Sequence, residues 1–485
     1  MLNTLEYLRV SDDLLSIVEK SRVFARDQIS EKIKKLEEQY FTPPRIAQIM
    51  TNLFTAGPEK SMTVLDPCAG VGNLAAALYE FGLKNKELQH LTLIERDPFL
   101  YNSCVKNFSA VKAAQIFNAD FFQSLSTLKK FDRIILNPPY AKLNSASDIS
   151  KQCVKTLGYA ESNLYSAFIS HCLKLLAPEG ELVAIVPRSF CNGAMFKNFR
   201  KNLNNNFHLQ AFYLFESRKI FSDSKILQEV IIIKVGTRKP RTVKIYHENN
   251  AGDSSSASFS AKTIVFPTDP AKVIHIPMAE GDRELLSKIS KFSSTLKSQG
   301  FRASTGKVVD FRCVSLLSIK SGPSTVNLIY QDSVSYGAEA NLLTTGNKPR
   351  HIINNTKSKA LLITKNNYIL IRRISFKEAP TRIIASPLLE RHFIKDSIGV
   401  ENHLNYIWGE RAEITEEICL ALSAYLSCQT VDRYVRRFSG HTQINATDLN
   451  SLPIPDADEL ARFSKLNKNL TLPQLITSAD KYFFN

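Results

Sequence analysis

The chain has 485 residues, of which 44% are hydrophobic and 22% are charged. This composition excludes a disordered or fibrous protein, and the length predicts two or three domains that each bury a core. Lysine and arginine outnumber aspartate and glutamate by 62 to 46, which leaves a formal net charge of +16. Such an excess favours a polyanionic partner, either nucleic acid or an anionic membrane surface, although many basic proteins bind nothing acidic.

The cysteine and hydropathy patterns narrow the cellular context. The 8 cysteines are scattered, without a Cys-x-x-Cys pair or a histidine at zinc-ligand spacing, so we expect no disulfide framework and no metal site. Residues 1–20 place acids among their apolar positions and therefore predict an amphipathic helix, not a signal peptide. No apolar run approaches the length of a membrane span. We expect a cytoplasmic protein without a membrane partner.

In the first half of the chain, short apolar runs alternate with helical stretches. The expected strands are 63–65, 91–94, 133–136, 181–186 and 229–235. This alternation predicts an α/β fold with a mostly parallel sheet covered on both faces. Ligands of such sheets bind beyond the carboxyl ends of the strands, so polar residues directly after each apolar run are candidate functional residues.

The residue composition changes after the last of these strands. Residues 249–260 are rich in Asn, Gly, Ser and Ala, which indicates a flexible loop or linker. Beyond residue 283, short strands at 368–374 and 382–385 and a helix at 414–437 predict an α+β second half, by elimination. We therefore expect an N-terminal helical segment (1–40), an α/β domain (41–245), a linker (246–282) and an α+β domain (283–485).

The first motif is a glycine turn within residues 64–73, between an expected strand and the helix that begins at Leu74. Gly70 and Gly72 permit a close backbone approach and offer N–H groups at a helix N-terminus. The turn lacks the three-glycine dinucleotide fingerprint and the Gly-Lys-Ser/Thr of a phosphate-binding loop, which disfavours NAD and ATP. A tight connection between strand and helix is an equally good explanation of the turn alone.

Two acids and a cysteine lie close to this turn in the expected fold. Glu95 ends the second strand, where a carboxylate can accept both hydroxyl hydrogens of a ribose. Asp120 either contacts a ligand or caps a helix N-terminus. Cys68 has no neighbouring base or cation, so we interpret it as a small packing residue and not as a nucleophile.

The most specific motif is Asn-Pro-Pro-Tyr at positions 137–140, directly after the apolar run 131–136. The two prolines fix the backbone and remove N–H donors. They leave a stiff array of acceptors, the Asn137 side-chain oxygen and the Pro138 carbonyl, beside the Tyr140 ring. Such an array suits a planar ligand that carries an NH2 group. A proline-rich structural turn is the alternative.

Together these motifs resemble those of the S-adenosylmethionine-dependent amino-methyltransferases, specifically the adenine-N6 DNA methyltransferases of type II restriction-modification systems. Residues 39–44 resemble the family's cofactor-carboxylate motif, and the order of parts is that of its gamma group. Segments 368–378, 401–406 and 439–449 also resemble type II members, so the resemblance covers most of the chain. It implies a Rossmann-like catalytic domain at 41–245 and a DNA target-recognition domain at 283–485.

The resemblance also implies roles for individual residues. The cofactor, S-adenosylmethionine, would contact Tyr40, Thr42, Asp66, Gly70, Gly72, Glu95, Asp120 and Phe121. The catalytic residues would be Asn137, Pro138 and Tyr140, while Pro139 and Phe221 would bind a base rotated out of the duplex. For Phe221, an ordinary core position is the alternative. Hydrogen bonds to Asn137 and Pro138 would localise the N6 lone pair, so we expect direct methyl transfer through positioning and electrostatics.

Candidate DNA contacts in the second half are Arg372, Arg373, Lys377, Arg436, His441 and Gln443, with Arg382, Arg433 and Arg437 as further basic candidates. Each taken singly also fits a solvated surface charge. We expect positive residues to line a cleft between the two domains, so that binding of double-stranded DNA weakens steeply with salt. Fewer than about fifty residues precede the cofactor motif, which predicts a stand-alone methyltransferase with any restriction endonuclease encoded separately. We also expect the protein to be monomeric on DNA.

Two other functions stay open. Methyltransferases that act on an RNA base or on a protein glutamine amide also meet a planar NH2 group, although the basic second half and residues 42–44 favour DNA. A non-catalytic DNA-binding protein with a vestigial cofactor fold is the third reading. The joint presence of Asp66, Gly70, Glu95, Asn137 and Tyr140 argues against it.

Overall fold

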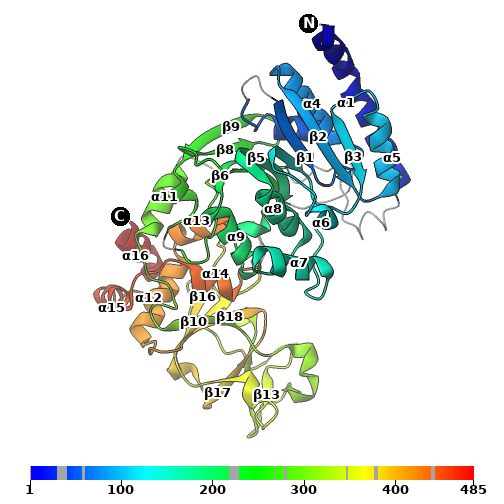
Figure 1. The fold of residues 1–485 in the computed structure, drawn as a ribbon. Coiled ribbons are helices and arrows are strands. Elements are labelled where there is room, and N and C mark those ends of the chain that lie inside the picture. The colour runs from blue at the N-terminus through cyan, green and yellow to red at the C-terminus, as the bar shows by residue number, and fades with distance from the viewer. Residues whose placement is uncertain are drawn as a thin grey trace. The chain divides into compact units, whose positions relative to one another are not determined.

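The computed structural model describes residues 2–29, 41–56, 61–217, 229–267, 269–277, 281–345, 348–375, 381–438 and 443–485. The chain forms two compact units (Figure 1). The first comprises residues 1–191 with 195–265, and the second comprises 192–194 with 266–485. Among the described residues, no helix is long and apolar enough to cross a membrane.

The first unit is built on a nine-stranded sheet in the order β3-β2-β1-β4-β5-β7-β6-β8-β9. Its strands are β1 Ser61–Asp66, β2 Leu88–Glu95, β3 Ala114–Asn118, β4 Phe131–Leu136, β5 Leu176–Pro187, β6 His208–Phe215, β7 Val230–Gly236, β8 Val243–Glu248 and β9 Ser254–Phe259. Strands β1 to β5 are mutually parallel, and β7 is antiparallel to both of its neighbours. The chain order reverses between β1 and β4, which confirms the predicted Rossmann-like α/β fold and defines a ligand-binding switch point.

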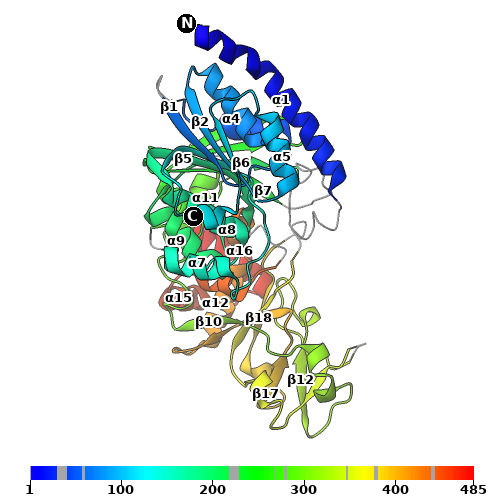
Figure 2. The same ribbon diagram turned by 45° about the vertical axis from the view of Figure 1, so that its right-hand side comes forward.

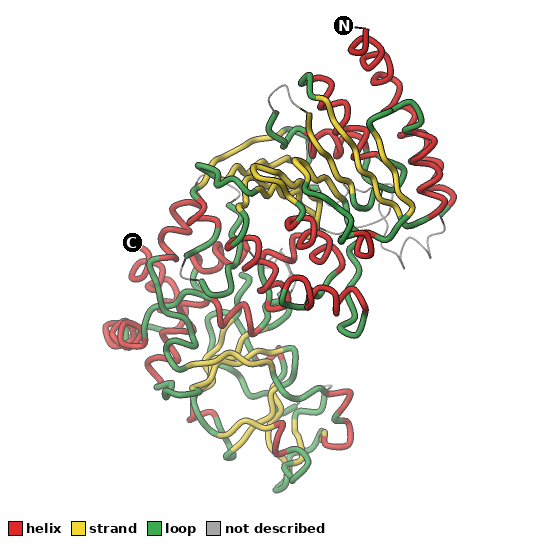
Figure 3. The backbone as a smooth tube through the Cα atoms, in the orientation of Figure 1, coloured by secondary structure: helices red, strands yellow, loops and turns green. Residues whose placement is uncertain are grey.

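Helices cover both faces of this sheet (Figures 2 and 3). They are α1 Leu2–Gln28, α3 Pro44–Thr51, α4 Asn73–Lys84, α5 Pro98–Asn107, α6 Phe121–Ser124, α7 Asp148–Leu157, α8 Leu164–Lys174, α9 Lys197–Asn205 and α10 Ala261–Ile264. The predicted N-terminal helix is confirmed and continues to Gln28. It packs on α4 and α5 with a buried stripe of Leu14, Val18, Arg22 and Ala25, at the spacing of one helix face.

The expectation of a flexible linker at 249–260 is wrong. After a turn that Asn249 closes, residues 254–259 form β9, which pairs antiparallel with β8 from Glu248 opposite Ser254 to Val243 opposite Phe259. All side chains of β9 except that of Phe259 are exposed. The strand is held by backbone pairing at the sheet edge, which leaves no hydrophobic alternation in the sequence. The sequence pattern did not predict strands β3, β6 and β8 either.

The second unit confirms the predicted α+β character. It contains a four-stranded sheet, β10-β18-β15-β16, and a five-stranded sheet, β11-β13-β12-β17-β14. Its strands are β10 Phe301–Thr305, β11 Leu317–Ser318, β12 Thr325–Ile329, β13 His351–Ile353, β14 Leu362–Thr364, β15 Tyr368–Arg372, β16 Ala385–Leu388, β17 Ser397–Val400 and β18 Leu404–Gly409. Its α-helices are α11 Gly281–Ser290, α12 Glu416–Ser427, α13 Gln429–Phe438, α14 Ala446–Ser451, α15 Ala457–Leu466 and α16 Leu472–Phe484.

The helix predicted at 414–437 is two helices with a break at Cys428. The backbone of Cys428 is extended, with φ −73° and ψ 158°. The Asp480 carboxylate accepts hydrogen bonds from the backbone N–H groups of Gln429 and Thr430, at 2.8 and 2.9 Å. These two donors open α13, so a residue of α16 stabilises a new helix start that local sequence does not signal.

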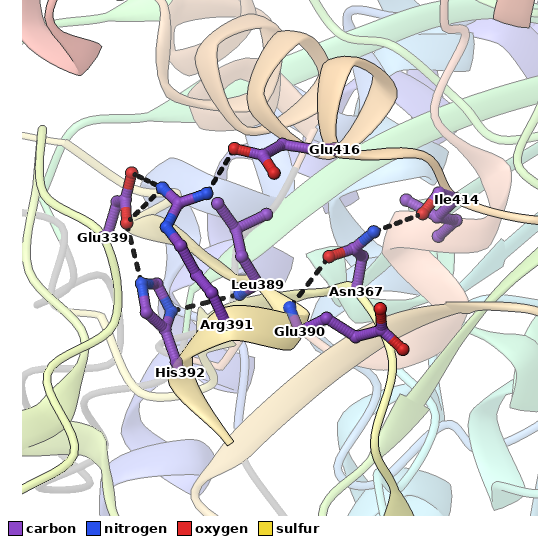
Figure 4. A network of polar contacts seen from close by, with 8 residues as sticks. All are labelled: Glu339, Asn367, Leu389, Glu390, Arg391, His392, Ile414 and Glu416. Carbon is purple, nitrogen blue, oxygen red and sulfur yellow. Dashed lines mark hydrogen bonds and ion pairs between the residues drawn. The ribbon is translucent and has the colours of Figure 1, made fainter. Parts of the chain in front are cut away.

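A polar network joins several loops of the second unit (Figure 4). The Arg391 guanidinium donates to both carboxylate oxygens of Glu339, at 2.7 and 3.0 Å, and also pairs with Glu416 in the first turn of α12. His392 Nε2 lies 2.8 Å from Glu339 Oε2. Asn367 joins the same 3-10 turn to the segment before α12. The network ties β16 and its following turn to α12 through charge-assisted hydrogen bonds.

Candidate active site

The glycine turn between β1 and α4 has a backbone that only glycine adopts easily. Gly70 and Gly72 have φ angles of +58° and +96°, in the left-handed region. A Cβ atom at Gly72 would lie 2.3 Å from Cε2 of Phe108, so there is no space for a larger residue. The backbone N–H of Ala69 donates to the carbonyl of Ile94 at 3.0 Å, which joins the turn to the end of β2. The turn is therefore a fixed part of the sheet edge.

Asp66, the last residue of β1, is a buried carboxyl group with an unusual environment. Its side chain is 1% exposed, and burial raises its pKa to about 8. Glu95 raises this pKa further, whereas the backbone N–H of Cys68 lowers it. No described residue donates a hydrogen bond to Oδ2 of Asp66. Because a buried acceptor without a donor is costly, this oxygen is suited to a ligand that brings its own donor.

Glu95 connects the glycine turn to the end of β2. Its Oε2 accepts the N–H of Gly70 and its Oε1 accepts the N–H of Asp97, both at 2.8 Å. Burial is the main cause that raises the pKa of Glu95, and the two backbone hydrogen bonds oppose it. A carboxylate offers about four acceptor positions. Glu95 can therefore hold the turn and also accept from a ligand.

Asn137 follows β4 directly, and its amide is held from two sides. Nδ2 donates to Thr42 Oγ1 at 3.0 Å, and Oδ1 accepts from the Tyr140 hydroxyl at 3.0 Å. Tyr140 is 4% exposed, and its ring lies edge-on to Tyr165 with centroids 6.2 Å apart. This arrangement fixes which amide atom is the acceptor and where it lies, before any ligand arrives.

A pocket opens at the carboxyl ends of β1, β2 and β4 and contains about 780 Å³ of empty space, including the part open to solvent. It is lined by Phe41, Pro67, Cys68, Gly70, Glu95, Arg96, Leu100, Ala119, Asp120, Phe121, Phe122, Asn137, Pro139, Ile149, Leu164 and Phe168. Phe121 stacks on Phe168 with centroids 5.1 Å apart and an interplanar angle of 12°. The mixture of apolar walls with few polar groups is typical of small-molecule sites.

Asp120 caps a helix and also lies in the lining of the pocket. Its carboxylate accepts the N–H groups of Phe122 and Gln123, at 2.8 and 3.2 Å, and so caps α6. Asp120 also lines the pocket, next to Phe121. The pocket therefore presents an acceptor beside an aromatic wall.

Comparison with known proteins decides the family. Residues 73–221 match the Eco57I restriction-modification methylase family. The chain is 34% identical over 475 residues to the type II methyltransferase M.BsuBI of Bacillus subtilis, covering 93% of this chain and 94% of that protein. It is 32% identical over 467 residues to the type II methyltransferase M.PstI of Providencia stuartii, covering 92% of each. The chain belongs to the type II methyltransferases of restriction-modification systems.

This result confirms the resemblance to the type II methyltransferases of restriction-modification systems, and such proteins are enzymes. Among solved structures, the Type IIL restriction-modification enzyme MmeI in complex with DNA has a TM-score of 0.50 and 12% identity. That alignment covers all of this chain and 74% of the other. At such low identity the likeness supports the fold alone.

Most of the residues predicted for the methyltransferase site lie in the pocket or beside it. Six line it directly: Gly70, Glu95, Asp120, Phe121, Asn137 and Pro139. Thr42, Asp66 and Tyr140 are buried beside it, and Thr42 and Tyr140 are both bonded to Asn137. Pro138 is buried too. Tyr40 and Phe221 lie outside the described residues.

The sequence did not indicate several lining residues, among them Phe41, Leu100, Ile149, Leu164 and Phe168. The Phe41 ring lies 3.8 Å from where a Cβ of Gly70 would be, so it covers the glycine turn. Phe41 lies within residues 39–44, and the resemblance of this segment to the cofactor-carboxylate motif could have indicated it. Ile149 and Phe168 are apolar residues of helices α7 and α8, and their pattern is that of ordinary core positions.

The predicted DNA contacts of the second unit have varied environments. Arg373 donates to the side chain of Gln443 at 3.4 Å and to the Asn402 carbonyl at 3.3 Å, so two predicted residues meet. Arg372 Nε donates to the Val334 carbonyl at 2.8 Å. Lys377 and His441 lie outside the described residues.

Three further arginines are held by acids or buried. Arg436 pairs with Asp432 at 2.6 Å, and Arg437 pairs with Asp282 at 2.9 Å. Arg382 is 1% exposed, with its backbone N–H bonded to Asp432. A buried guanidinium cannot reach DNA from this position, so the expectation for Arg382 is wrong.

Proposed function

We propose that this methyltransferase binds S-adenosylmethionine in the pocket at the carboxyl ends of β1, β2 and β4 and methylates N6 of adenine in double-stranded DNA. The observation that carries the proposal is the fixed amide of Asn137, which lies in the same pocket as Glu95. An acceptor held rigidly at a strand end suits an amino group as substrate.

The residues present fit this cofactor. Asp66 Oδ2 is a buried acceptor in need of a donor, and the cofactor's α-ammonium group is such a donor. Glu95 would accept ribose hydroxyls, and Asp120 with Phe121 would hold the adenine ring. When bound, S-adenosylmethionine supplies a methyl group attached to a sulfonium, which is open to attack by a nitrogen lone pair.

The catalytic contribution of the chain is positioning. Asn137 Oδ1 and the Pro138 carbonyl would accept the two N6 hydrogens, which localises the lone pair and orients it. Tyr140 and Thr42 would keep the Asn137 amide in place. Burial, followed by the charges of Asp66 and Glu95, raises the pKa of the Cys68 thiol well above its usual range. A neutral thiol is a poor nucleophile, so direct transfer without a covalent enzyme intermediate is favoured.

A base within duplex DNA must leave the stack before its N6 can reach this pocket, at a cost of a few kcal/mol. Pro139 lines the pocket and Tyr140 is its neighbour, so these two residues would receive the base. Phe221 stays a prediction as the opposite stacking residue.

DNA as the substrate is supported by the family and by charge. The relatives are type II methyltransferases, and this chain carries a net charge of +16. We propose that it is the modification component of a restriction-modification system. In the second unit, the bonded pair of Arg373 and Gln443 is the favoured DNA contact, because Gln443 is exposed and presents an amide beside a guanidinium.

Transfer of tritium from methyl-labelled S-adenosylmethionine tests the proposal. Unmethylated duplex DNA should be labelled, while RNA and protein should not, and nucleoside analysis should yield N6-methyladenine. Asn137→Ala should lower turnover by about a hundredfold or more, with cofactor binding preserved. Label on a protein glutamine or on RNA would instead support the alternative substrates. Near-normal turnover by Asn137→Ala would refute the mechanism.

A further inference from the structure

A second hollow lies in the first unit, at the other end of the same strands. Its walls are residues 52–56 after α3, the starts of β4 and β5, the end of β7 and residues 238–246. It contains about 1640 Å³ of empty space, including the part open to solvent. We call it the basic hollow, because its rim carries Arg238, Lys239, Arg241 and Lys244.

These four side chains are exposed, and none forms an ion pair with another described residue. They fall within seven positions that contain no acid. Four like charges placed this closely repel one another, and no described acid forms an ion pair with any of them. Such an arrangement is stabilised when an anion binds.

The segment that presents the cations is held in place. It connects β7 to β8 across β6, and Gln210 of β6 donates to the Arg238 carbonyl at 2.9 Å. The backbone N–H of Thr237 donates to the Gly180 carbonyl at 3.2 Å, just before the parallel part of β5. A connection fixed to two strands presents its cations without a large loss of backbone entropy on binding.

Most acids of the basic hollow already have partners. Glu181 pairs with Lys234 at 2.8 Å, and Asp132 accepts both the N–H and the hydroxyl of Thr63, at 2.9 and 2.8 Å. Burial lowers the pKa of Lys234, and the nearby cations Arg133 and Lys244 lower it as well, while Glu181 opposes them. Only Glu179 is an exposed acid among the described lining residues. The hollow is therefore net positive.

The lining residues also indicate which of two polyanionic partners, nucleic acid or an acidic protein, fits the basic hollow better. Its large apolar and aromatic residues are buried or half-buried, and none of them is an exposed hydrophobic side chain: Leu53, Phe54, Met62 and Tyr246. Protein interfaces depend on apolar and aromatic anchors at their centres. Phosphate backbones are bound chiefly by lysine and arginine. Charge without an apolar anchor favours nucleic acid over an acidic protein.

The basic hollow is separate from the catalytic pocket. Asp132 lines the hollow near the start of β4, and Asn137 lines the pocket after its end. Five residues of extended chain span about 16 Å. The two sites open at opposite ends of the sheet. DNA that is bound at Asn137 therefore does not occupy the hollow.

We propose that the basic hollow binds the phosphate backbone of a second DNA segment, distinct from the segment that delivers the target base. This goes beyond the proposed function, since it involves neither the cofactor nor the identity of the methylated base. The binding would be independent of sequence, because lysine and arginine at a phosphate backbone read charge and not base edges.

Lysine footprinting on the full-length protein tests the location. Lys239 and Lys244 should be acetylated several-fold more slowly in the presence of a random-sequence duplex of about 20 base pairs, about two helical turns. Lys106 and Lys112, which are exposed elsewhere on the same unit, should change little. Protection by polyglutamate but not by DNA would overturn the proposal in favour of an acidic protein, and no protection by either would overturn it outright.

The number of duplexes bound per protein molecule provides a second test. Sedimentation at low salt should show two equivalents of the short duplex on the wild type and on the control Lys106→Gln/Lys112→Gln, but one on Lys239→Gln/Lys244→Gln. In the wild type, affinity for the second equivalent should weaken with salt, and the two lysines should contribute about 1.8 to the slope of log K against log salt. Two equivalents on all three proteins would refute the proposal. Methyl transfer measured on the same samples shows separately whether the proposed function fails.

Discussion

The side-chain amide of Asn137 donates to the hydroxyl of Thr42 across 95 positions of sequence, at 3.0 Å. This bond joins the residue after β4 to the segment that leads into α3. Thr42 is 4% exposed, so its end of the bond is shielded from water. The cofactor-carboxylate motif and the Asn-Pro-Pro-Tyr motif, which were recognised separately in the sequence, therefore form one hydrogen-bonded unit.

Removal of this bond should slow turnover without abolishing cofactor binding. Thr42→Val keeps the shape but deletes the acceptor, and the loss of one buried hydrogen bond corresponds to about a tenfold decrease in kcat. Thr42→Ser keeps the hydroxyl and should stay within about twofold of the wild type. Steady-state kinetics separates the outcomes, since a change confined to the KM for S-adenosylmethionine would show that Thr42 acts only on the cofactor.

Tyr140 should have two separable roles. Tyr140→Phe removes the hydroxyl that donates to Asn137 Oδ1 at 3.0 Å but keeps the ring. We expect about a tenfold lower kcat with unchanged base stacking. Tyr140→Ala should lower both turnover and the 2-aminopurine signal of a base held outside the duplex. Equal fluorescence losses in the two variants would contradict this division.

Asp66 should make cofactor binding depend on pH. Its pKa is raised to about 8 by burial, so below that pH a proton must leave before an ammonium group can pair with the carboxylate. Affinity for S-adenosylmethionine should therefore increase by up to about tenfold per unit as the pH rises towards 8. Asp66→Asn should bind weakly and lack this increase. Calorimetric titration across this range tests it, and a parallel slope in Asp66→Asn would assign the effect to another group.

The stability of the fold should also depend on pH, and the titrating group in this case is Glu161. Burial raises its pKa to about 7 from 4.5, and Ser170 Oγ donates to its Oε1 at 2.6 Å. Between these two pKa values the folded state binds a proton that the unfolded state has released. Stability is therefore greatest below the lower value and falls, by up to about 3 kcal/mol, as the pH rises through about 7.

Glu161→Gln has no proton to lose, so its urea midpoint should fall less between these pH values than that of the wild type. Glu161 lies on the loop whose backbone pairs with the exit from the Asn-Pro-Pro-Tyr motif, where Leu164 N–H donates to the Ala141 carbonyl at 2.8 Å. Identical pH dependence in variant and wild type would rule out Glu161 as the group responsible.

The sequence predicted the strand-end residues of the site far better than its walls. Asp66, Glu95 and Asn137 each follow a buried apolar run, and parallel topology brings such ends to one edge. Phe168 reaches the pocket through the packing of α8, which local periodicity does not specify. The same limit explains the break before α13, because its cap, Asp480, lies 51 positions away.

Arg382 shows why charge in the sequence is not enough to predict a DNA contact. Its basic side chain indicated a DNA contact, yet its backbone N–H bonds to Asp432, its guanidinium bonds to the Ser375 carbonyl, and the residue is 1% exposed. Exposure of an arginine is set by tertiary contacts that a sequence does not display. Conversely, the exposed small residues of β9 are ordered by backbone pairing alone.

Gly72 offers a test of how rigid the glycine turn must be. Gly72→Ala places a methyl group 2.3 Å from Phe108 and also forces an alanine to a φ of +96°. The backbone strain alone costs about 1–2 kcal/mol, and the overlap adds a cost that Phe108 must relieve by moving. Gly158→Ala is the matched control, because Gly158 has a φ of +83° with nothing within 4 Å of the added Cβ.

We expect Gly158→Ala to lose only the strain term in urea unfolding and to keep cofactor affinity. Gly72→Ala should lose more stability and also bind S-adenosylmethionine more weakly, because the turn carries Gly70, whose N–H is fixed by Glu95. Adding Phe108→Ala to Gly72→Ala should restore part of the cofactor affinity by removing the overlap, although the Phe108 cavity lowers stability in its own right. If Gly72→Ala and Gly158→Ala behaved alike, the contact with Phe108 would not be what requires glycine at this position.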